Sequence, residues 1–491
     1  MTHQLSQLQP QAVWDYFYQL TQVPRPSKHE DKIQAFMLDF GRSLGLKTHR
    51  DEVGNIIIKK PATAGYENRQ GVVLQAHLDM VPQANNDTPH DFVNDPISAI
   101  VDGEWVCAQG TTLGADNGIG VAAIMAVLAD NTLEHGAIEA LFTCDEETSM
   151  AGAFALNSDE LDGDILLNLD SEEEKELCIG CAGGVDAVAV LPIQRQALVS
   201  GKQLYQLTLK GLKGGHSGVD IALQRGNANK LLARCLTLLD IDWQLLSFNG
   251  GNMRNAIPRE ANAVIAVAAD NQAQLDKHLS AFQLILAKEY GGVEADIQLS
   301  AQAISKTADN IPQHGLTANS QKTLLNTLMA CPDGVCRMSL DMEGLVETSS
   351  NLAIVTTDEA QVTVEYLLRS SVDSVRDALA AQITAVFELA GAGIQFIGAY
   401  PGWKPNPQSA ILQVMKTTGK QLFGKTPKVH AIHAGLECGI LGGTYPHWDM
   451  ISFGPTIRFP HSPDEKVYIP SVEGFYQWLL LTLTAVPQKN S

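Results

Sequence analysis

Four short segments of this chain combine histidine with carboxylates in a way that could bind divalent metal ions. They are Ala76-His77-Leu78-Asp79, Gly114-Ala115-Asp116-Asn117-Gly118, Cys144-Asp145-Glu146-Glu147 and Asn168-Leu169-Asp170. Mixed imidazole and carboxylate ligands suit zinc, cobalt or manganese. A single carboxylate such as Asp116 can bridge two metal ions. The set therefore predicts two adjacent divalent metal ions, with zinc as the first choice and cobalt or manganese as alternatives.

The doublet Glu146-Glu147 suits a division of tasks between neighbouring carboxylates. One can bind metal while the other stays free to accept a proton from water. Asp79 follows His77 by two residues and can orient the imidazole, as carboxylates commonly do for metal-bound histidines. Each segment alone has a plain structural explanation as a surface motif, a solvated face or a helix cap. Their joint placement favours a metal site.

The elements that must position these residues are the strands that precede three of the four segments. Residues 71–76, 138–144 and 165–169 are short apolar runs, which are typical of buried strands. They alternate with helical patterns such as residues 119–128, which indicates a mostly parallel sheet flanked by helices. In such sheets ligands bind beyond the carboxyl ends of the strands, which is where three of the four segments lie. Asp116 opens the helix that follows its segment, so it lies at a turn that can point it the same way.

The pattern changes after Gly183-Gly184. Half-exposed strands, with alternating polar and apolar residues, are predicted at residues 203–210, 261–268 and 360–368. The earlier α/β pattern returns after Tyr400, with a strand at residues 450–454. We therefore expect an α/β catalytic domain, residues 1–185 and 400–491, interrupted by an inserted α+β domain, residues 186–399.

A split catalytic domain needs its last metal ligand from late in the chain. His461, in Pro460-His461-Ser462, comes shortly after the predicted strand at residues 450–454 and is the leading candidate. His433 and His447 are alternatives on composition alone.

The overall charge limits the partners of the protein. The 491 residues include 34 Lys and Arg against 55 Asp and Glu, a net charge of −21. Such a surface repels phosphate backbones, so we expect no nucleic-acid partner. The longest late apolar run, residues 478–486, is too short to cross a bilayer and predicts a terminal core helix, so no membrane partner is expected.

The N-terminal residues 1–11 lack a basic start followed by an apolar run, so we expect no signal peptide and a cytoplasmic location. The eight cysteines are then expected to be reduced. Cys178 and Cys181 form a CxxC motif, but no second pair is present to complete a zinc site.

Taken in order, these residues resemble the aminoacyl-histidine dipeptidase family, also called peptidase D or bacterial carnosinase-like. It belongs to a larger group of dinuclear zinc exopeptidases and deacylases. The resemblance spans essentially the whole chain. Its segments are residues 76–82, 112–118, 142–148, 167–170 and 460–465.

The resemblance implies roles for seven residues. His77 and Asp170 bind one metal ion, Glu147 and His461 bind the other, Asp116 bridges both, Asp79 orients His77, and Glu146 is the general acid/base. It also implies a cis peptide bond between Asp116 and Asn117.

The inserted domain resembles the lid of this family. His216, in Gly214-Gly215-His216-Ser217-Gly218, matches a histidine that stabilises the oxyanion. Asn255, Arg369 and Gly435 match substrate contacts, and a guanidinium suits a C-terminal carboxylate because it donates two parallel hydrogen bonds. A homodimer through the lid is a further implication, and a monomer with an internally duplicated lid is the alternative.

The implied activity is hydrolysis of dipeptides, notably Xaa-His dipeptides such as β-Ala-His, by a metal-bridging hydroxide with Glu146 as general acid/base. An N-acyl amino acid deacylase of the same group remains an alternative. A metal-retaining binding protein without catalysis is a third hypothesis, but it predicts loss of Glu146, which is present.

Overall fold

A computed structural model describes residues 4–305 and 313–489 of the chain. It divides into two compact units. The first contains residues 1–180, 403–431 and 436–491, and the second contains residues 181–402 and 432–435.

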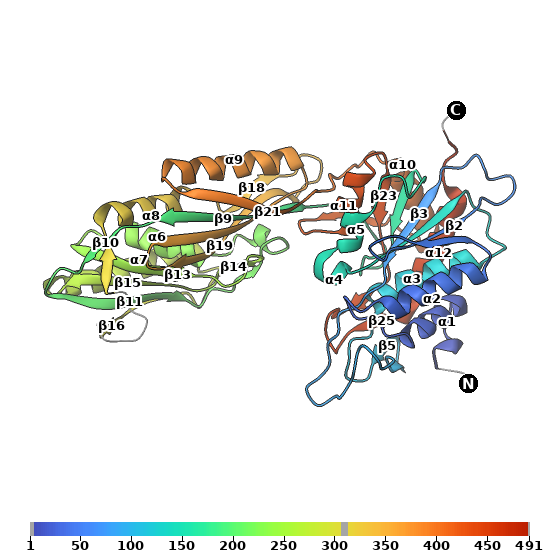
Figure 1. Ribbon diagram of the computed structural model, residues 1–491, viewed down its shortest axis with the longest axis horizontal. Coiled ribbons are helices and arrows are strands. Elements are labelled where there is room, and N and C mark those ends of the chain that lie inside the picture. The colour runs from blue at the N-terminus through green and yellow to red at the C-terminus, as the bar shows by residue number, and fades with distance from the viewer. Residues whose placement is uncertain (1–3, 306–312, 490–491) are drawn as a thin grey trace. The chain divides into compact units, whose positions relative to one another are not determined.

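The first unit is built around a mixed sheet (Figure 1). Its central strands are parallel neighbours in the order β6 (Ile138–Thr143), β3 (Val72–His77), β7 (Ile165–Asn168) and β23 (Asp449–Ser452). Antiparallel strands extend it on both sides: β2 (Ile56–Lys60) and β1 (Lys47–Arg50) beyond β6, and β8 (Glu176–Cys181) beyond β23. Strand β22 (Lys428–Ile432) lies next to β8 at the edge. The parallel strands at the centre of the sheet agree with the mostly parallel sheet that the sequence predicted. The antiparallel strands at its edges make the whole sheet mixed.

Helices flank this sheet because its central strands are apolar on both faces. Every residue of β3, β6 and β7 is buried. Helix α3 (Ala115–Ala129), rich in Ala, Val and Gly, packs against β3 and is buried through residue 128. The other flanking helices are α1 (Gln11–Thr21), α2 (Asp31–Ser43), α10 (Ala410–Phe423), α11 (Glu437–Thr444) and α12 (Ile469–Ala485).

A small antiparallel sheet holds the late segment of the first unit. Its order is β24 (Ile457–Arg458), β25 (Lys466–Tyr468), β5 (Trp105–Ala108) and β4 (Ala99–Asp102). Because β24 and β25 pair with each other, the connection between them forms a short loop that contains His461. The sequence singled out His461 as a ligand candidate, but it did not predict the strands on either side of this loop.

The second unit is an antiparallel sheet with helices on one face (Figure 1). The strands run β16 (Gln298–Ile304), β11 (Lys202–Lys210), β15 (Ala261–Ala268), β13 (Trp243–Gly250), β19 (Val346–Thr357), β20 (Gln361–Ser370), β9 (Gly183–Pro192) and β21 (Gly393–Tyr400), and β18 (Gly334–Met338) also pairs with β19. Helices α6 (Ala228–Thr237), α7 (Gln272–Tyr290), α8 (Ala318–Ala330) and α9 (Asp373–Leu389) share one apolar core with alternate strand residues.

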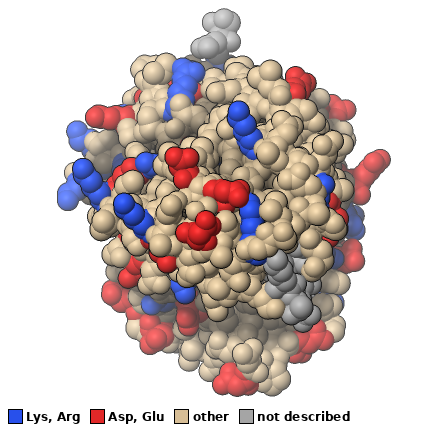
Figure 2. Space-filling view, turned by 90° about the vertical axis from the view of Figure 1, so that its left-hand side faces the viewer, with Lys and Arg blue, Asp and Glu red and all other residues tan. Residues whose placement is uncertain are grey.

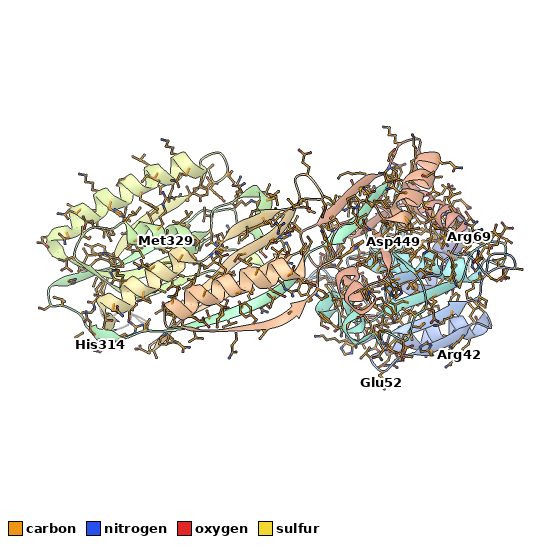
Figure 3. All side chains as sticks on the ribbon, turned by 90° about the horizontal axis from the view of Figure 1, so that it is seen from above. Arg42, Glu52, Arg69, His314, Met329 and Asp449 are labelled. Carbon is orange, nitrogen blue, oxygen red and sulfur yellow. The ribbon has the colours of Figure 1, made fainter. Side chains whose placement is uncertain are left out.

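The labelled residues of Figure 3 help to locate these elements. His314 begins β17 (His314–Leu316), Met329 lies in α8, and Asp449 begins β23, where its carboxylate accepts a hydrogen bond from the Ile411 amide of α10 at 3.0 Å. In the space-filling view of Figure 2, Lys and Arg are interspersed with Asp and Glu on the face shown. No helix among the described residues is both long enough and apolar enough to span a membrane.

Candidate metal centre

Three of the predicted ligand segments meet at one edge of the central sheet. His77 is the last residue of β3 and lies opposite Thr143, the last residue of β6. Glu146 and Glu147 follow β6 in the short helix α4 (Glu146–Ser149), and Asp170 follows β7, which is parallel to β3. These parallel neighbours deliver their side chains to the same end of the sheet, as the sequence predicted.

Asp116 lies between the two predicted histidines. Its Oδ1 is 3.1 Å from Nε2 of His77, and its Oδ2 is 3.4 Å from Nε2 of His461. The two oxygens of one carboxylate thus face two different imidazoles, which is the arrangement that a bridging ligand requires.

Each histidine has a second carboxylate beside it. Nε2 of His77 is 3.3 Å from Oδ1 of Asp170, and Nε2 of His461 is 2.9 Å from Oε2 of Glu147. In the two sets His77-Asp116-Asp170 and Asp116-Glu147-His461, the potential ligand atoms lie within 4.8 Å of one another. The same holds for the set of His77, Glu146 and Glu147, so the Glu146 carboxylate also adjoins the cluster.

Asp79 organises the segment around His77 and the glutamate doublet. Its Oδ1 lies 3.4 Å from Nδ1 of His77. It also accepts hydrogen bonds from the Glu146 amide at 3.0 Å and the Glu147 amide at 3.2 Å. Asp79 is fully buried, so these contacts hold the imidazole and both glutamates in one orientation.

The residue after Asp116 also contacts the cluster. The Asp116-Asn117 peptide bond is cis, as predicted. The Asn117 side-chain amide donates to the Leu169 carbonyl at 2.8 Å and to Oδ1 of Asp170 at 2.5 Å. Asn117 therefore connects the Asp116 segment to the Asp170 segment.

The carboxylates create a strongly negative field at the two histidines. Burial by itself would lower the pKa of His77, but Asp170, Asp116 and Asp79 outweigh it and raise that pKa well above its ordinary value. Hydrogen bonds to Asp116 and Glu147 raise the pKa of His461 to about 11. A field that attracts protons so strongly also attracts divalent cations.

The residues present fit a pair of divalent metal ions. Two imidazoles and three carboxylates form a donor set that suits zinc, cobalt or manganese. Oε1 of Glu147 is buried and has no hydrogen-bond partner among the described residues, which leaves this oxygen available for a cation.

Glu146 lies beside these groups with a different environment. Burial raises its pKa well above the ordinary value of a glutamate, while the nearby His77 opposes the shift. A carboxylate with a raised pKa holds a proton more readily, which is the property that a general acid/base needs. The roles of all seven residues remain predictions.

The predicted residues of the second unit also converge. A Cβ atom built on Gly218 would lie 3.1 Å from Cε1 of His216 and 3.2 Å from Nε of Arg369. A Cβ on Gly435 would lie 3.1 Å from the Tyr400 ring, and the Tyr400 hydroxyl accepts a hydrogen bond from Arg369 at 3.2 Å.

Asn255 adjoins this group through the backbone. The short strand β12 (Gly215–His216) pairs with β14 (Ala256–Ile257), and the Ser217 amide donates to the Asn255 carbonyl at 2.8 Å. Arg369 is 5% exposed, and its Nε has no hydrogen-bond partner in the described part of the chain. The second unit therefore holds a buried cation with an unused donor, which suits an anionic ligand.

The two alternative histidines lie elsewhere. Nε2 of His433 is 2.7 Å from the Ser349 hydroxyl, and Nε2 of His447 is 3.3 Å from the Gly163 carbonyl. Neither is in a candidate metal cluster of residues 4–305 and 313–489, and those clusters contain no cysteine.

Sequence reasoning missed several residues that support the site. Arg25 and Glu465 contact the backbone of the ligand segments, and the buried Glu437 accepts hydrogen bonds from Gln75 at 2.7 Å and Thr143 at 2.8 Å. The one available signal for Arg25 was its position between Pro24 and Pro26 in a rigid loop. Glu465 is the last residue of the segment 460–465 that carries the family resemblance, but the sequence alone indicated no role for it.

Comparison with known proteins identifies a family. The model of peptidase family M20/M25/M40 matches residues 73–485. The chain is 49% identical over 490 residues to the cytosol non-specific dipeptidase of Escherichia coli (strain K12), covering 99% of this chain and 100% of that protein.

Solved structures agree with this result. The crystal structure of aminoacylhistidine dipeptidase from Vibrio alginolyticus matches with a TM-score of 0.95 and 48% identity, covering 99% of each chain. An aminopeptidase structure from Bacillus cereus ATCC 10987 matches with a TM-score of 0.57 and 16% identity, covering 98% of this chain and 99% of that chain, which shows similarity of fold alone.

Proposed function

This chain belongs to peptidase family M20/M25/M40, and from that premise we propose that it is a dipeptidase that uses two divalent metal ions. The observation that carries the proposal is the position of Asp116, whose two carboxylate oxygens face His77 and His461 separately. His77 and Asp170 would hold one ion, and Glu147 and His461 would hold the other. The donor set favours zinc, with cobalt or manganese as substitutes.

The proposed substrates are dipeptides, including Xaa-His dipeptides such as β-Ala-His. Support comes from the names of two relatives that span nearly the whole chain, a cytosol non-specific dipeptidase and an aminoacylhistidine dipeptidase. The first name also supports a cytoplasmic location. A homodimer through the second unit, implied by the sequence resemblance, completes the proposal, and sedimentation analysis tests it.

The side chains of the first unit supply proton transfer and orientation. When bound, the metal ions would polarise the scissile carbonyl and lower the pKa of the attacking water. The Glu146 carboxylate accepts the proton of that water and returns it to the nitrogen of the leaving amine. Asp79 keeps Glu146 in place by accepting a hydrogen bond from its backbone N–H, and it orients the His77 ring through a contact with Nδ1.

The second unit is proposed to bind the polar ends of the substrate. Arg369 would bind the C-terminal carboxylate through its unused donor, and His216 would donate a hydrogen bond to the oxyanion. Asn255 and Gly435 adjoin these groups and would contact the substrate backbone.

The test compares hydrolysis of β-Ala-His and several α-dipeptides by the native protein, the chelator-treated protein, and the treated protein supplied with zinc or cobalt. Glu146→Ala is expected to lower kcat by about 10²–10⁴-fold, because it removes the general base. Glu52→Ala is the matched control, since Glu52 is an exposed glutamate of the same unit and is labelled in Figure 3.

Activity that disappears on metal removal, returns with metal and falls in Glu146→Ala alone would support the proposal. A protein that holds two metal ions but hydrolyses no dipeptide would contradict it. N-acetyl amino acids would then be the next substrates, because a deacylase is the alternative within this group.

A further inference from the structure

Arg25 is a buried cation in the first unit whose hydrogen bonds go to backbone carbonyls. It is 3% exposed. Its Nη1 donates to the carbonyls of Leu78 at 2.9 Å and Asp79 at 3.0 Å, and its Nη2 donates to the carbonyl of Gly114 at 2.5 Å. Burying a guanidinium is costly unless its donors are used, so this position implies a specific purpose.

The three carbonyls belong to two of the ligand segments. Leu78 and Asp79 directly follow His77, and Gly114 precedes Asp116 by two residues. A single planar guanidinium therefore connects the segment of His77 to the segment of Asp116. The fork geometry of the group fixes the spacing between the carbonyls that it joins.

Glu465 makes the complementary connection from the other side. It is 2% exposed, and its Oε2 accepts hydrogen bonds from the amides of Leu113 at 2.7 Å and Gly114 at 2.9 Å. Its Oε1 accepts from the Asp116 amide at 3.1 Å. Glu465 follows His461 by four residues in the same loop region, so it connects the segment of His461 to the segment of Asp116.

Two glycines make room for the Arg25 guanidinium. A Cβ atom on either Gly114 or Gly118 would lie 2.6 Å from Nη2 of Arg25. Gly114 also has a φ of +71°, a left-handed conformation that favours glycine. The backbone on both sides of Asp116 thus approaches the guanidinium more closely than a side chain would allow.

We propose that Arg25 and Glu465 are positioning residues that set the spacing of the two metal sites, Arg25 by holding Asp116 relative to His77 and Glu465 by holding it relative to His461. This inference rests on the proposed dinuclear function. It assigns the two residues no contact with substrate.

The test measures metal binding directly in Arg25→Lys and Glu465→Gln. Arg25→Lys keeps the charge but replaces the planar fork with a single nitrogen. Glu465→Gln keeps the volume but replaces one acceptor oxygen with a donor. Isothermal titration calorimetry with Co²⁺ gives the number of ions bound and their affinity. The magnetic coupling between two bound Co²⁺ ions reports the distance between them.

The wild-type protein is expected to bind two coupled Co²⁺ ions. Both variants are expected to bind at least one ion about 10–100-fold more weakly and to show altered coupling, the loss typical of residues that orient metal ligands. Lys60→Met is the matched control, because Lys60 donates to the carbonyls of Val127 at 3.0 Å and Asp130 at 2.5 Å. Neither Val127 nor Asp130 belongs to a candidate metal cluster of the described residues, so Lys60→Met should lower the stability of the protein without lowering its affinity for cobalt.

Folded Arg25→Lys and Glu465→Gln proteins with wild-type affinity and coupling would overturn the inference. If neither folds, Gly118→Ala replaces them, because its new methyl group would displace the guanidinium. Unchanged cobalt binding in a folded Gly118→Ala protein would overturn the role given to Arg25. A wild-type protein that binds fewer than two ions would instead overturn the dinuclear function on which the inference rests.

Discussion

The histidines of the candidate metal cluster and those beside Arg369 have pKa values that shift in opposite directions. In the first unit, carboxylates raise the pKa of His77 and His461. In the second unit, burial and the positive charge of Arg369 lower the pKa of His216, and the same causes lower that of His433 to about 3. The same side chain thus occupies a negative environment in the metal cluster and a positive environment beside Arg369.

This difference indicates a division of binding tasks. The negative cluster around Asp116 suits cations, whereas the cluster of Arg369, His216 and Tyr400 suits an anion such as a substrate carboxylate. A neutral imidazole keeps one N–H donor, so His216 can donate a hydrogen bond to the same ligand. Variants in each cluster should therefore affect different steps.

The largest effect is expected from Asp116→Asn. This change removes one negative charge from the position between His77 and His461, so it should abolish high-affinity binding of at least one metal ion. Residues that only orient metal ligands are expected to lower activity by about 10–100-fold when they are changed. The loss of activity in Asp116→Asn should be larger than that. Metal analysis of the purified variant checks this result, and two retained ions with normal kcat would refute a bridging role.

An intermediate effect is expected from Arg369→Met. Loss of a buried charged partner costs about 2–5 kcal/mol, so kcat/KM for a dipeptide should fall at least about 30-fold while metal content stays unchanged. A dipeptide whose C-terminus is an amide provides the control. The wild type should lose efficiency on it, and the variant should lose little further; equal additional loss in both proteins would argue against carboxylate recognition by Arg369.

The smallest effect concerns stability and His433, which is 6% exposed. Its folded pKa of about 3 lies below the ordinary 6.5, so only the unfolded chain takes up the proton between these values. The stability that the neutral form provides is fully present above pH 6.5 and is lost as the pH falls toward 3.

Urea unfolding at several pH values measures this contribution. Between pH 6.5 and 5, the wild type should lose roughly 2 kcal/mol relative to His433→Gln. Parallel pH profiles for the two proteins would show that His433 is not excluded from protonation in the folded state.

The sequence predicted the parts of the site that follow buried strands. Strands β3, β6 and β7 are continuous apolar runs, and the residues after them were recognised by type and spacing. The sequence context of His461 made it the preferred ligand candidate over His433 and His447. In the described regions, His461 alone of the three lies in a metal cluster. The second unit comprises residues 181–402 and 432–435, whereas the sequence led us to expect an inserted domain of residues 186–399 and did not place residues 432–435 in it.

The sequence did not predict residues that act through the backbone of distant segments. Arg25 contacts carbonyls 53 to 89 residues away, and Glu465 contacts amides 349 to 352 residues away. Such contacts leave no periodic pattern, because the partner atoms are present in nearly every residue. Strands β4 and β5 were missed for a different reason: they are short and only partly buried.

The most direct test of the central claim is anomalous diffraction at the zinc edge from crystals grown with zinc. We predict two peaks, one beside His77 and Asp170 and the other beside Glu147 and His461, with Asp116 in contact with both. A single peak, or two peaks of which only one contacts Asp116, would contradict a bridged pair of metal ions.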